Sequence, residues 1–164
     1  MQQLINDLLS FSRVSTRQNP FQTVDLNETL QAVLSDLEIL IQDHQARIVV
    51  KHLPTIEADP TQMRQLFQNL ISNAIKFRRE ETPEITIESS LYTSYQQQSR
   101  EHDMVEITVA DNGIGFEEKY LDRIFHIFQR LDGRKFEGSG IGLAICRRIA
   151  SKHGGNITAS SEPG

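Results

Sequence analysis

The first two helices are predicted from apolar residues that recur every three or four positions along the chain. Residues 1–15 have this spacing but no N-cap residue, which is typical of the end of a longer helix. Residues 16–24 break the pattern and contain Pro20, as expected of a linker. A second helix should begin at Asp25, because Glu28 stands three residues later and completes a capping box.

Two further helices have clearer signals at their ends. The segment "ADPTQMRQLFQNLISNAIKF" offers Asp59 as N-cap, Pro60 at the first helical position and Gln62 to complete the box. Its apolar residues form an unbroken stripe along one face. The segment "GSGIGLAICRRIASKHGG" predicts a glycine turn, a helix and a glycine stop at Gly154.

Strand-like segments lie between and after these helices. "RIVVKHL", stopped by Pro54, predicts one strand, and "NITASS" near the end of the sequence predicts another. "EITIESSL" and "MVEITVA" alternate with period two and flank the polar residues 92–103, so we expect a hairpin with a long loop. Residues 117–137 show no regular pattern, and loops of that length inside a domain are usually functional.

The order of these elements favours a two-layer α/β sandwich of the α+β kind. Strands and helices are partly segregated along the chain, so we expect a mixed β-sheet with the helices packed on one face. A doubly wound parallel fold is not expected, because it would need a regular alternation of strands and helices.

Composition and charge restrict the functions that such a fold can serve. The 164 residues carry a formal net charge of −5, which argues against nucleic acid as a partner, although a local basic patch would be compatible with it. No segment has the about 20 consecutive apolar residues that span a bilayer. The single cysteine, Cys146, permits no internal disulfide and lies in an apolar run, where we expect a buried, unreactive thiol. A chain without disulfides suits a reducing compartment, so we expect a cytoplasmic location.

Three short segments contain residues suited to nucleotide chemistry. In the first, Asn69, Asn73 and Lys76 fall on one strip of a helix, beside its apolar stripe. Amide oxygens one turn apart can ligate a hard cation, and a lysine can contact a phosphate. A solvated helix edge is the alternative interpretation of the same residues.

The second segment is "DNGIGF", at the end of a predicted strand. Gly113 and Gly115 permit positive φ and a close approach of the backbone to a flat ligand, whereas the Asp111 carboxylate can only accept hydrogen bonds. A tight turn capped by the aspartate is the alternative. A calcium loop fits poorly, because the required spacing of acidic residues is missing.

The third segment, "EGSGIGLAI", has Gly138, Gly140 and Gly142 before or at the start of a helix, where free N–H groups attract phosphate. It is not a P-loop, and Leu143 occupies the third glycine position of a dinucleotide fingerprint. An ordinary glycine-rich turn is the alternative. Together the three segments offer the ligands that a Mg²⁺–nucleotide requires, and residues 117–137 could fold over its phosphates.

These segments resemble the ATP-binding catalytic domain of sensor histidine kinases. That domain belongs to the GHKL superfamily, with DNA gyrase, the heat-shock chaperone of 90 kDa and the mismatch-repair ATPases. The matching boxes are "QNLISNAIKF", "DNGIGF", "RIFHIFQRL" and "GSGIGLAI", and the resemblance covers about residues 25–161. Details such as "IFQRL" are similar to phytochrome-type and hybrid kinases. The resemblance implies a Bergerat-type fold with a long ATP lid.

The resemblance also implies ATP and Mg²⁺ as cofactors and a role for individual residues. Asp111 would accept a hydrogen bond from the adenine amine, and Gly113 and Gly115 would let the loop pass close to the base. Asn73 would ligate Mg²⁺, with Asn69 beside it.

Further implied roles concern the phosphates and the lid. Lys76 would contact phosphate and Arg130 would neutralise charge on the γ-phosphate, so both join the two asparagines as candidate catalytic residues. Phe125 and Phe128 would anchor the lid, and Phe77 would line the cleft. The remaining implied ATP contacts are Ile114, Gly138, Ser139, Gly140, Ile141, Gly142 and Leu143.

Asn69 favours a kinase over a hydrolase. In the related ATPases a Glu at this position activates water, whereas an amide has no useful basicity near neutral pH. The resemblance therefore implies transfer of the γ-phosphate to a His on a dimerisation hairpin, and from there to an Asp of a response regulator receiver domain. A GHKL-type ATPase and a non-catalytic nucleotide-binding module are the alternatives.

The phosphate-accepting His is not expected within this sequence. None of the histidines stands in the family's context, His-Glu/Asp-x-Arg-x-Pro-Leu, so we expect all of them at the surface or in the lid. They are His44, His52, His102, His126 and His153.

The resemblance also divides the chain. Residues 1–15 are similar to the end of the second helix of the dimerisation hairpin of a homodimeric parent, and residues 16–24 would be the linker. Residues 25–164 would form the catalytic domain, with its last strand truncated. We therefore expect a trimmed part of a longer protein that binds ATP but does not phosphorylate itself.

Overall fold

The computed structural model of the protein describes residues 2–16, 19–95, 101–115 and 142–159. The predicted lid falls between the last two ranges. Some of the residues expected to contact ATP therefore lie outside the described part of the chain. These are Phe125, Phe128, Arg130, Gly138, Ser139, Gly140 and Ile141.

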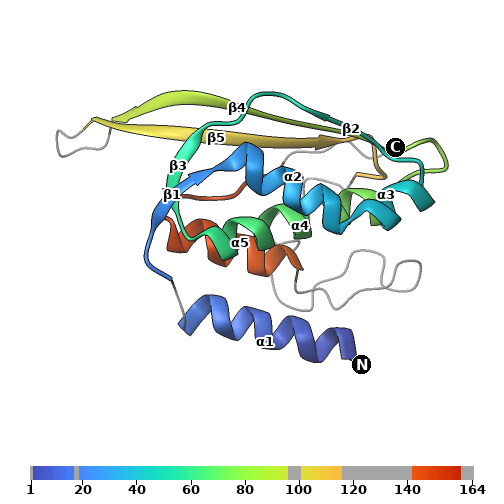
Figure 1. The fold of residues 1–164 in the computed structure, drawn as a ribbon, viewed down its shortest axis with the longest axis horizontal. Coiled ribbons are helices and arrows are strands. Elements are labelled where there is room, and N and C mark those ends of the chain that lie inside the picture. Colours follow the sequence, from blue (N-terminus) through green and yellow to red (C-terminus); the bar gives the residue numbers. More distant parts are fainter. Residues whose placement is uncertain (1, 17–18, 96–100, 116–141, 160–164) are drawn as a thin grey trace.

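A three-stranded mixed sheet forms one layer of the molecule (Figure 1). Strand β2 (Arg47–Val50) runs parallel to β4 (Glu84–Tyr95), and β4 pairs antiparallel with β5 (Glu101–Asp111). A separate antiparallel pair joins β1 (Gln22–Asp25) to β3 (Thr55–Ala58). The predicted mixed sheet is therefore confirmed.

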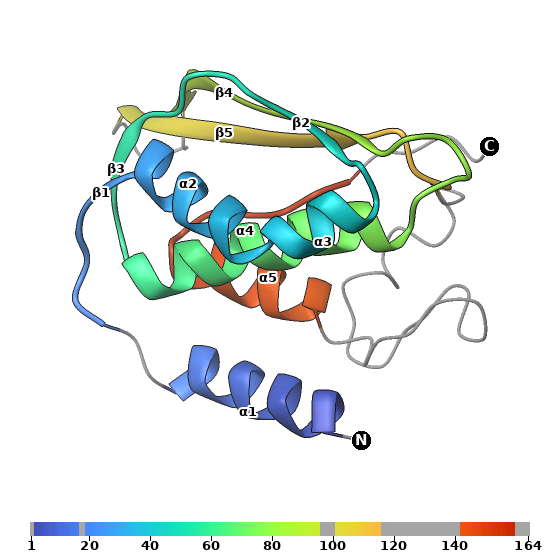
Figure 2. The ribbon, with the colours of Figure 1, turned by 45° about the vertical axis from the view of Figure 1, so that its right-hand side comes forward.

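The helices lie together on one side of the mixed sheet, as Figures 1 and 2 show from two directions. Helices α2 (Leu26–Asp36), α4 (Pro60–Lys76) and α5 (Gly142–Lys152) pack beside one another, and the short α3 (Glu38–Asp43) follows α2. Helix α1 (Gln2–Thr16) packs against α5, farther from the sheet. The predicted two-layer α/β sandwich is confirmed, and α1 adds a helix outside it.

Apolar side chains from both layers meet in one core. Leu30 of α2, Phe67 and Ile71 of α4, Ile87 of β4 and Ile149 of α5 are each at most 1% exposed. Burying a side chain of this size contributes roughly 1.5–3 kcal/mol, so the apolar stripe predicted on α4 is what binds the helices to the sheet.

Two aspartates fix where helices begin. The Oδ1 atom of Asp59 accepts hydrogen bonds from the backbone N–H groups of Thr61 at 3.0 Å and Gln62 at 3.2 Å, so the predicted cap of α4 is confirmed. Asp25 caps α2 by accepting from the Asn27 N–H at 2.9 Å. Both carboxylates satisfy N–H groups that have no partner inside the helix.

Two strands and the length of the hairpin differ from the predictions. Strands β1 and β3 were not predicted, because four residues are too few to show an alternation; β1 begins at Gln22, inside the predicted linker. The hairpin arms continue to Tyr95 and Glu101, so the predicted loop over 92–103 was too long. Residues 92–103 are mostly polar and show no regular alternation, so their sequence resembles a loop although most of them pair as strands.

Two further predictions need correction. The strand predicted from "NITASS" is wrong for residues 156–159, which are in no strand, because they pair with none of the described strands. The second predicted helix is two helices that meet at Leu37. Hydrogen bonds from Leu37 N to Val33 O at 3.0 Å and from Ile41 N to Leu37 O at 2.9 Å continue the helical pattern across the junction, which explains why the periodicity is unbroken.

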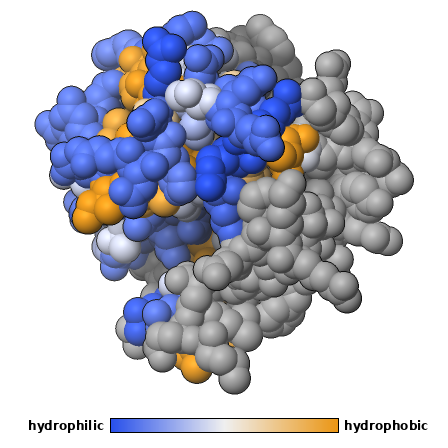
Figure 3. All heavy atoms as spheres, turned by 90° about the vertical axis from the view of Figure 1, so that its right-hand side faces the viewer, coloured by the Kyte–Doolittle hydropathy of each residue, from blue (hydrophilic) through white to orange (hydrophobic). Residues whose placement is uncertain are grey.

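The described part of the surface is largely polar on the side shown in Figure 3, where only small groups of hydrophobic residues lie between hydrophilic ones. No helix among the described residues is both long enough and apolar enough to cross a membrane.

Candidate functional site

The start of α5 meets the middle of α4. A Cβ atom added at Gly142 would lie 3.8 Å from Asn73 Nδ2, 3.9 Å from Asn73 Oδ1 and 4.0 Å from Asn69 Oδ1. Two of the three segments selected from the sequence are thus brought together, although they are far apart along the chain. The N-terminus of a helix, which attracts negative charge, therefore lies beside two amide side chains.

Asn69 has an unusual environment. Its Nδ2 atom is buried and has no hydrogen-bond partner among the described residues. The neighbouring Cys146 is a buried thiol, whose sulfur is only a weak acceptor. A buried amide N–H without an acceptor is costly in a folded protein, so the Nδ2 atom of Asn69 is available to donate to a water molecule or a ligand oxygen.

Burial raises the pKa of Cys146 to about 12, and the nearby polar side chain of Asn69 offsets part of that increase. The thiolate form is disfavoured because the site lacks solvent. The predicted burial of this thiol is confirmed, and its raised pKa agrees with the predicted low reactivity.

Lys76 and Phe77 lie at the C-terminal end of α4. The Lys76 Nζ atom is 5.3 Å from the centroid of the Phe77 ring, a cation–π distance. The carbonyl oxygen of Phe77 accepts a hydrogen bond from Ile114 N at 3.0 Å. The end of α4 is therefore in direct contact with the segment "DNGIGF".

Gly113 is required by a close contact with the protein itself. A Cβ atom at this position would lie 2.5 Å from the Phe77 carbonyl oxygen and 2.8 Å from Asp111 Oδ1. Gly115 has a φ of 68°, which favours glycine. The sequence analysis attributed the glycine at position 113 to close contact with a bound base. The structure shows a second reason, because a Cβ atom there would collide with the Phe77 carbonyl at the end of α4.

Asp111 both caps its own turn and remains accessible. Its Oδ1 atom accepts a hydrogen bond from Gly113 N at 2.8 Å, and the residue is exposed at the end of β5. The turn cap considered as an alternative is therefore present. A carboxylate has a second oxygen, so the cap does not prevent Asp111 from accepting from a ligand.

Two residues that support this loop were missed by the sequence analysis. Arg79 donates from Nε to the Gly113 carbonyl at 2.8 Å. Asn112 accepts from Glu84 N at 2.9 Å through Oδ1 and donates through Nδ2 to the Thr82 carbonyl at 3.0 Å. Arg79 is the second residue after a recognisable box, but nothing in the sequence indicated which backbone group it would bind.

The histidines are placed differently from one another. His44 is half-buried and His52 is exposed, whereas His126 lies outside the described residues. His153 is half-buried like His44, but it is also held by the fold, because its Nε2 accepts from Asp59 N at 3.1 Å and its ring stacks on Phe21 with 4.8 Å between centroids.

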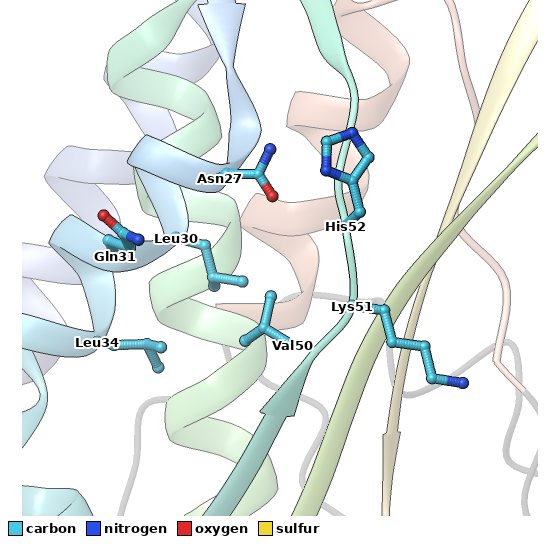
Figure 4. Close-up of a pocket in the computed structure, with 7 residues that line it drawn as sticks. All are labelled: Asn27, Leu30, Gln31, Leu34, Val50, Lys51 and His52. Atoms are coloured by element: carbon cyan, nitrogen blue, oxygen red, sulfur yellow. The ribbon is translucent and has the colours of Figure 1, made fainter.

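A hollow of about 340 Å³ lies apart from these segments, between α2 and the residues that follow β2 (Figure 4). Leu30, Leu34 and Val50 line it, while Lys51 points away and donates to Glu88 Oε2 at 2.9 Å. None of the residues expected to bind ATP lines this hollow, so it is not part of the candidate site.

Residues 58–164 match the sequence profile of the family described as "Histidine kinase-, DNA gyrase B-, and HSP90-like ATPase". The chain belongs to this family. The matched residues include both asparagines, the Asp111 loop and the whole of α5. The family and the fold predicted from the sequence are both confirmed.

Within this family the chain is similar to histidine kinases and phytochromes. It is 44% identical over 165 residues to Cyanobacterial phytochrome A of Nostoc sp. (strain PCC 7120), a match that covers all of this chain and 20% of that protein. The chain thus spans about a fifth of the length of this curated relative.

Solved structures show the same fold. Full-length ShkA, solved in complex with AMPPNP, is 30% identical with a TM-score of 0.73 and matches 98% of this chain and 33% of its own. The catalytic domain of histidine kinase ThkA is 28% identical with a TM-score of 0.67, and the match covers 85% of this chain and 88% of that domain. ThkA in complex with the response regulator protein TrrA is 25% identical with a TM-score of 0.71, covering 99% of this chain and 44% of that one. The described fold is that of a histidine kinase catalytic domain.

Proposed function

We propose that this chain is the ATP-binding catalytic domain of a two-component sensor histidine kinase. It would transfer the γ-phosphate of ATP to a His on a dimerisation hairpin, for relay to a response regulator. The observation that carries the proposal is the meeting of Asn69 and Asn73 with the start of α5, where the buried Nδ2 atom of Asn69 has no hydrogen-bond partner among the described residues.

Adenine would bind at the Asp111 loop. One carboxylate oxygen holds the turn, and the other is available to accept from the exocyclic amine of the base. Gly113, Ile114 and Gly115 would border the base, and Phe77 would line the cleft. A charged hydrogen bond of this kind contributes about 1.5–3 kcal/mol.

The triphosphate would lie between α4 and α5. Asn73 would ligate Mg²⁺ with Asn69 beside it, while Lys76 and the first backbone N–H groups of α5, from Gly142 and Leu143, would contact phosphate. The proposed lid contacts are Phe125, Phe128, Arg130, Gly138, Ser139, Gly140 and Ile141.

These residues fit a Mg²⁺ ion that arrives with the nucleotide. Among the described residues no cluster of three or more His, Cys, Asp or Glu could hold a metal alone. Mg²⁺ usually takes only one or two protein ligands and completes its shell with phosphate oxygens and water, so an amide oxygen of Asn73 suffices. When bound, the ion would offset the negative charge of the phosphates.

The amide at Asn69 supports phosphate transfer rather than hydrolysis. It cannot deprotonate a water molecule near neutral pH, so the γ-phosphate of bound ATP would persist until a protein nucleophile reaches it. The similarity of this chain to the catalytic domain of ThkA supports the same choice, because ThkA is a histidine kinase.

The partners follow from this proposal. Helix α1 would be the end of a dimerisation hairpin in a homodimeric parent, since Ile5, Leu8 and Leu9 expose apolar side chains at 39–50% and a second helix would cover them. Residues 16–24 would link it to a catalytic domain over 25–164. The ThkA–TrrA complex supports a response regulator as the downstream partner. Because the cytoplasm supplies ATP, we propose a cytoplasmic location.

The test is phosphate transfer in trans. The chain is mixed with a separately produced His-containing hairpin of a related kinase and with ATP labelled at the γ-phosphate. We expect acid-labile, base-stable label on the hairpin, none on a hairpin with Gln in place of its His, and none on the chain alone. Steady ATP turnover without the hairpin would instead support a GHKL-type ATPase, and a failure to bind Mg²⁺–ATP would support a non-catalytic module.

A further inference from the structure

We propose that Arg79 is a positioning residue for recognition of the adenine amine. Its guanidinium binds the Gly113 carbonyl and thereby fixes the loop from which the Asp111 carboxylate would read the base. This inference rests on the proposed function and adds to it a residue that determines specificity for the base.

A single peptide group is held from both ends by two residues that directly follow α4, Phe77 and Arg79. Its carbonyl, that of Gly113, accepts from Arg79 Nε at 2.8 Å, and its N–H, that of Ile114, donates to the Phe77 carbonyl at 3.0 Å. Two bonds on opposite sides of one planar unit determine its orientation. The charged donor also polarises the peptide, which strengthens the bond made by its N–H.

The Asp111 carboxylate is hydrogen-bonded to the adjacent peptide group, which shares the Cα atom of Gly113 with the braced one. Gly113 N donates to Asp111 Oδ1 at 2.8 Å, so the position of Gly113 determines where the carboxylate points. Asp111 is exposed at the end of a strand, and this bond to Gly113 connects its carboxylate to the braced loop. Without Arg79, the loop would keep the hydrogen bond from Ile114 N to the Phe77 carbonyl but lose the bond that holds the Gly113 carbonyl.

The direction of the Asp111 carboxylate matters most for its proposed hydrogen bond with the exocyclic amine of adenine. The exocyclic amine of adenine donates to a carboxylate, whereas a purine without that amine leaves the carboxylate without a donor. Sites built to bind a donor discriminate strongly against analogues that lack it. Loss of Arg79 should therefore reduce discrimination at the amine while leaving the contribution of the triphosphate unchanged.

Arg78 provides a matched control. It has the same charge and stands one residue earlier, but it donates from Nη1 to the Ile75 carbonyl at 3.3 Å and not to the loop. If Arg79 acted only by attracting the triphosphate, removal of either arginine would weaken all nucleotides to a similar degree.

The experiment measures Kd by calorimetry, with Mg²⁺, for ATP and for purine riboside triphosphate, which has hydrogen in place of the amine. For the wild-type chain we expect a preference for ATP of about 10- to 100-fold. Arg79→Met should reduce this preference about tenfold, with the affinity for the analogue within about twofold of wild type. Arg78→Met should keep the wild-type preference.

Equal losses for both nucleotides, or an unchanged preference, would overturn the inference. If Arg79→Met does not give a folded protein by circular dichroism, Arg79→Lys decides the question, because it keeps the charge but not the planar donor. A reduced preference in Arg79→Lys supports positioning, and a wild-type preference overturns it.

Asp111→Asn separates this inference from the proposed function. If that variant has a wild-type preference for ATP over the analogue, base recognition by Asp111 is wrong, and the proposed site fails with it. If it loses the preference while the Arg79 variants keep theirs, only the inference about Arg79 fails.

Discussion

At the scale of single residues, side chains in the candidate site combine structural and functional tasks. Asp111 uses one oxygen to hold its own turn, so the turn cap and the ligand contact are not exclusive interpretations of the same carboxylate. Gly113 is glycine because the end of α4 comes within 2.5 Å of where its Cβ would be. Residues next to a ligand site are therefore constrained by the protein before any ligand binds.

Cys146 makes stability depend on pH in a predictable direction. Burial raises its pKa from the ordinary 9.0 to about 12. Between these values the folded chain keeps the proton that the unfolded chain releases, so stability falls as the pH rises through this window. From pH 8 to 10 we expect the wild type to lose about 1.4 kcal/mol more than Cys146→Ala, measured by urea unfolding.

The alanine variant is the control for other groups that titrate at high pH, because it retains all of them. Equal losses in the two proteins would contradict the prediction. Rapid reaction of the folded wild-type thiol with a disulfide reagent at pH 8 would also contradict it, since only the thiolate is reactive.

The residue roles that the sequence predicted are those with local causes. Asp59 could be predicted as a cap because its partners stand two and three residues later. Arg79 reaches a carbonyl 34 residues away, and His153 accepts from a residue 94 positions earlier. No periodicity encodes such distant pairs, which arise only when the helices and the sheet have packed.

At the scale of elements, α5 connects the candidate site to the segment that follows α1. Its first residue, Gly142, lies beside the two asparagines of α4. Beyond its other end, His153 accepts from Asp59 N at 3.1 Å, and Asp59 Oδ2 accepts from Asn19 N at 2.9 Å. One helix therefore joins the proposed phosphate site to the segment that leads to α1.

His153→Ala should destabilise the chain by about 1–3 kcal/mol, as measured by urea unfolding. The substitution leaves the N–H of Asp59, a residue only 1% exposed, without its acceptor, and removes the stack on Phe21. Because Nε2 accepts this bond, the ring proton is on Nδ1 and donates to the Ile149 carbonyl at 2.7 Å. That bond is lost as well.

The matched control is His52→Ala, since the His52 side chain is exposed. It should change the free energy of unfolding by no more than about 0.5 kcal/mol. If the two alanine variants unfold at the same urea concentration, the bond between His153 and Asp59 does not stabilise the fold.

The elements themselves were predictable in proportion to their length and to the strength of their end signals. Helix α4 has a cap, a proline and a full apolar stripe, and its start was predicted correctly. Strands β1 and β3 have four residues each and exist because they pair with each other. Residues 156–159 were expected to form a strand from their sequence, but they pair with none of the described strands and are therefore not in one.

At the scale of the whole molecule, ligand binding and stability should be coupled. The candidate site draws on α4, β5 and α5, which pack into the same core. A ligand that binds only the folded chain stabilises all of it, by about 2.7 kcal/mol when its concentration is 100 times its Kd. The thermal midpoint therefore reports binding without any catalytic step.

Asn73→Ala should remove the part of this stabilisation that depends on Mg²⁺. For the wild type we expect ATP with Mg²⁺ to raise the midpoint more than ATP with a chelator, whereas the variant should show similar, small increases in both conditions. The physical reason is that Asn73 would supply the protein's oxygen ligand to the ion, while the adenine contact at Asp111 does not need it. Ser72→Ala, at the preceding position of the same helix, is the control and should behave as the wild type, because its hydroxyl donates to the Asn69 backbone carbonyl at 3.3 Å and would not contact the ion. If Mg²⁺ increases the midpoint of Asn73→Ala as much as that of the wild type, the ion is bound without Asn73 and the proposed metal ligand is wrong.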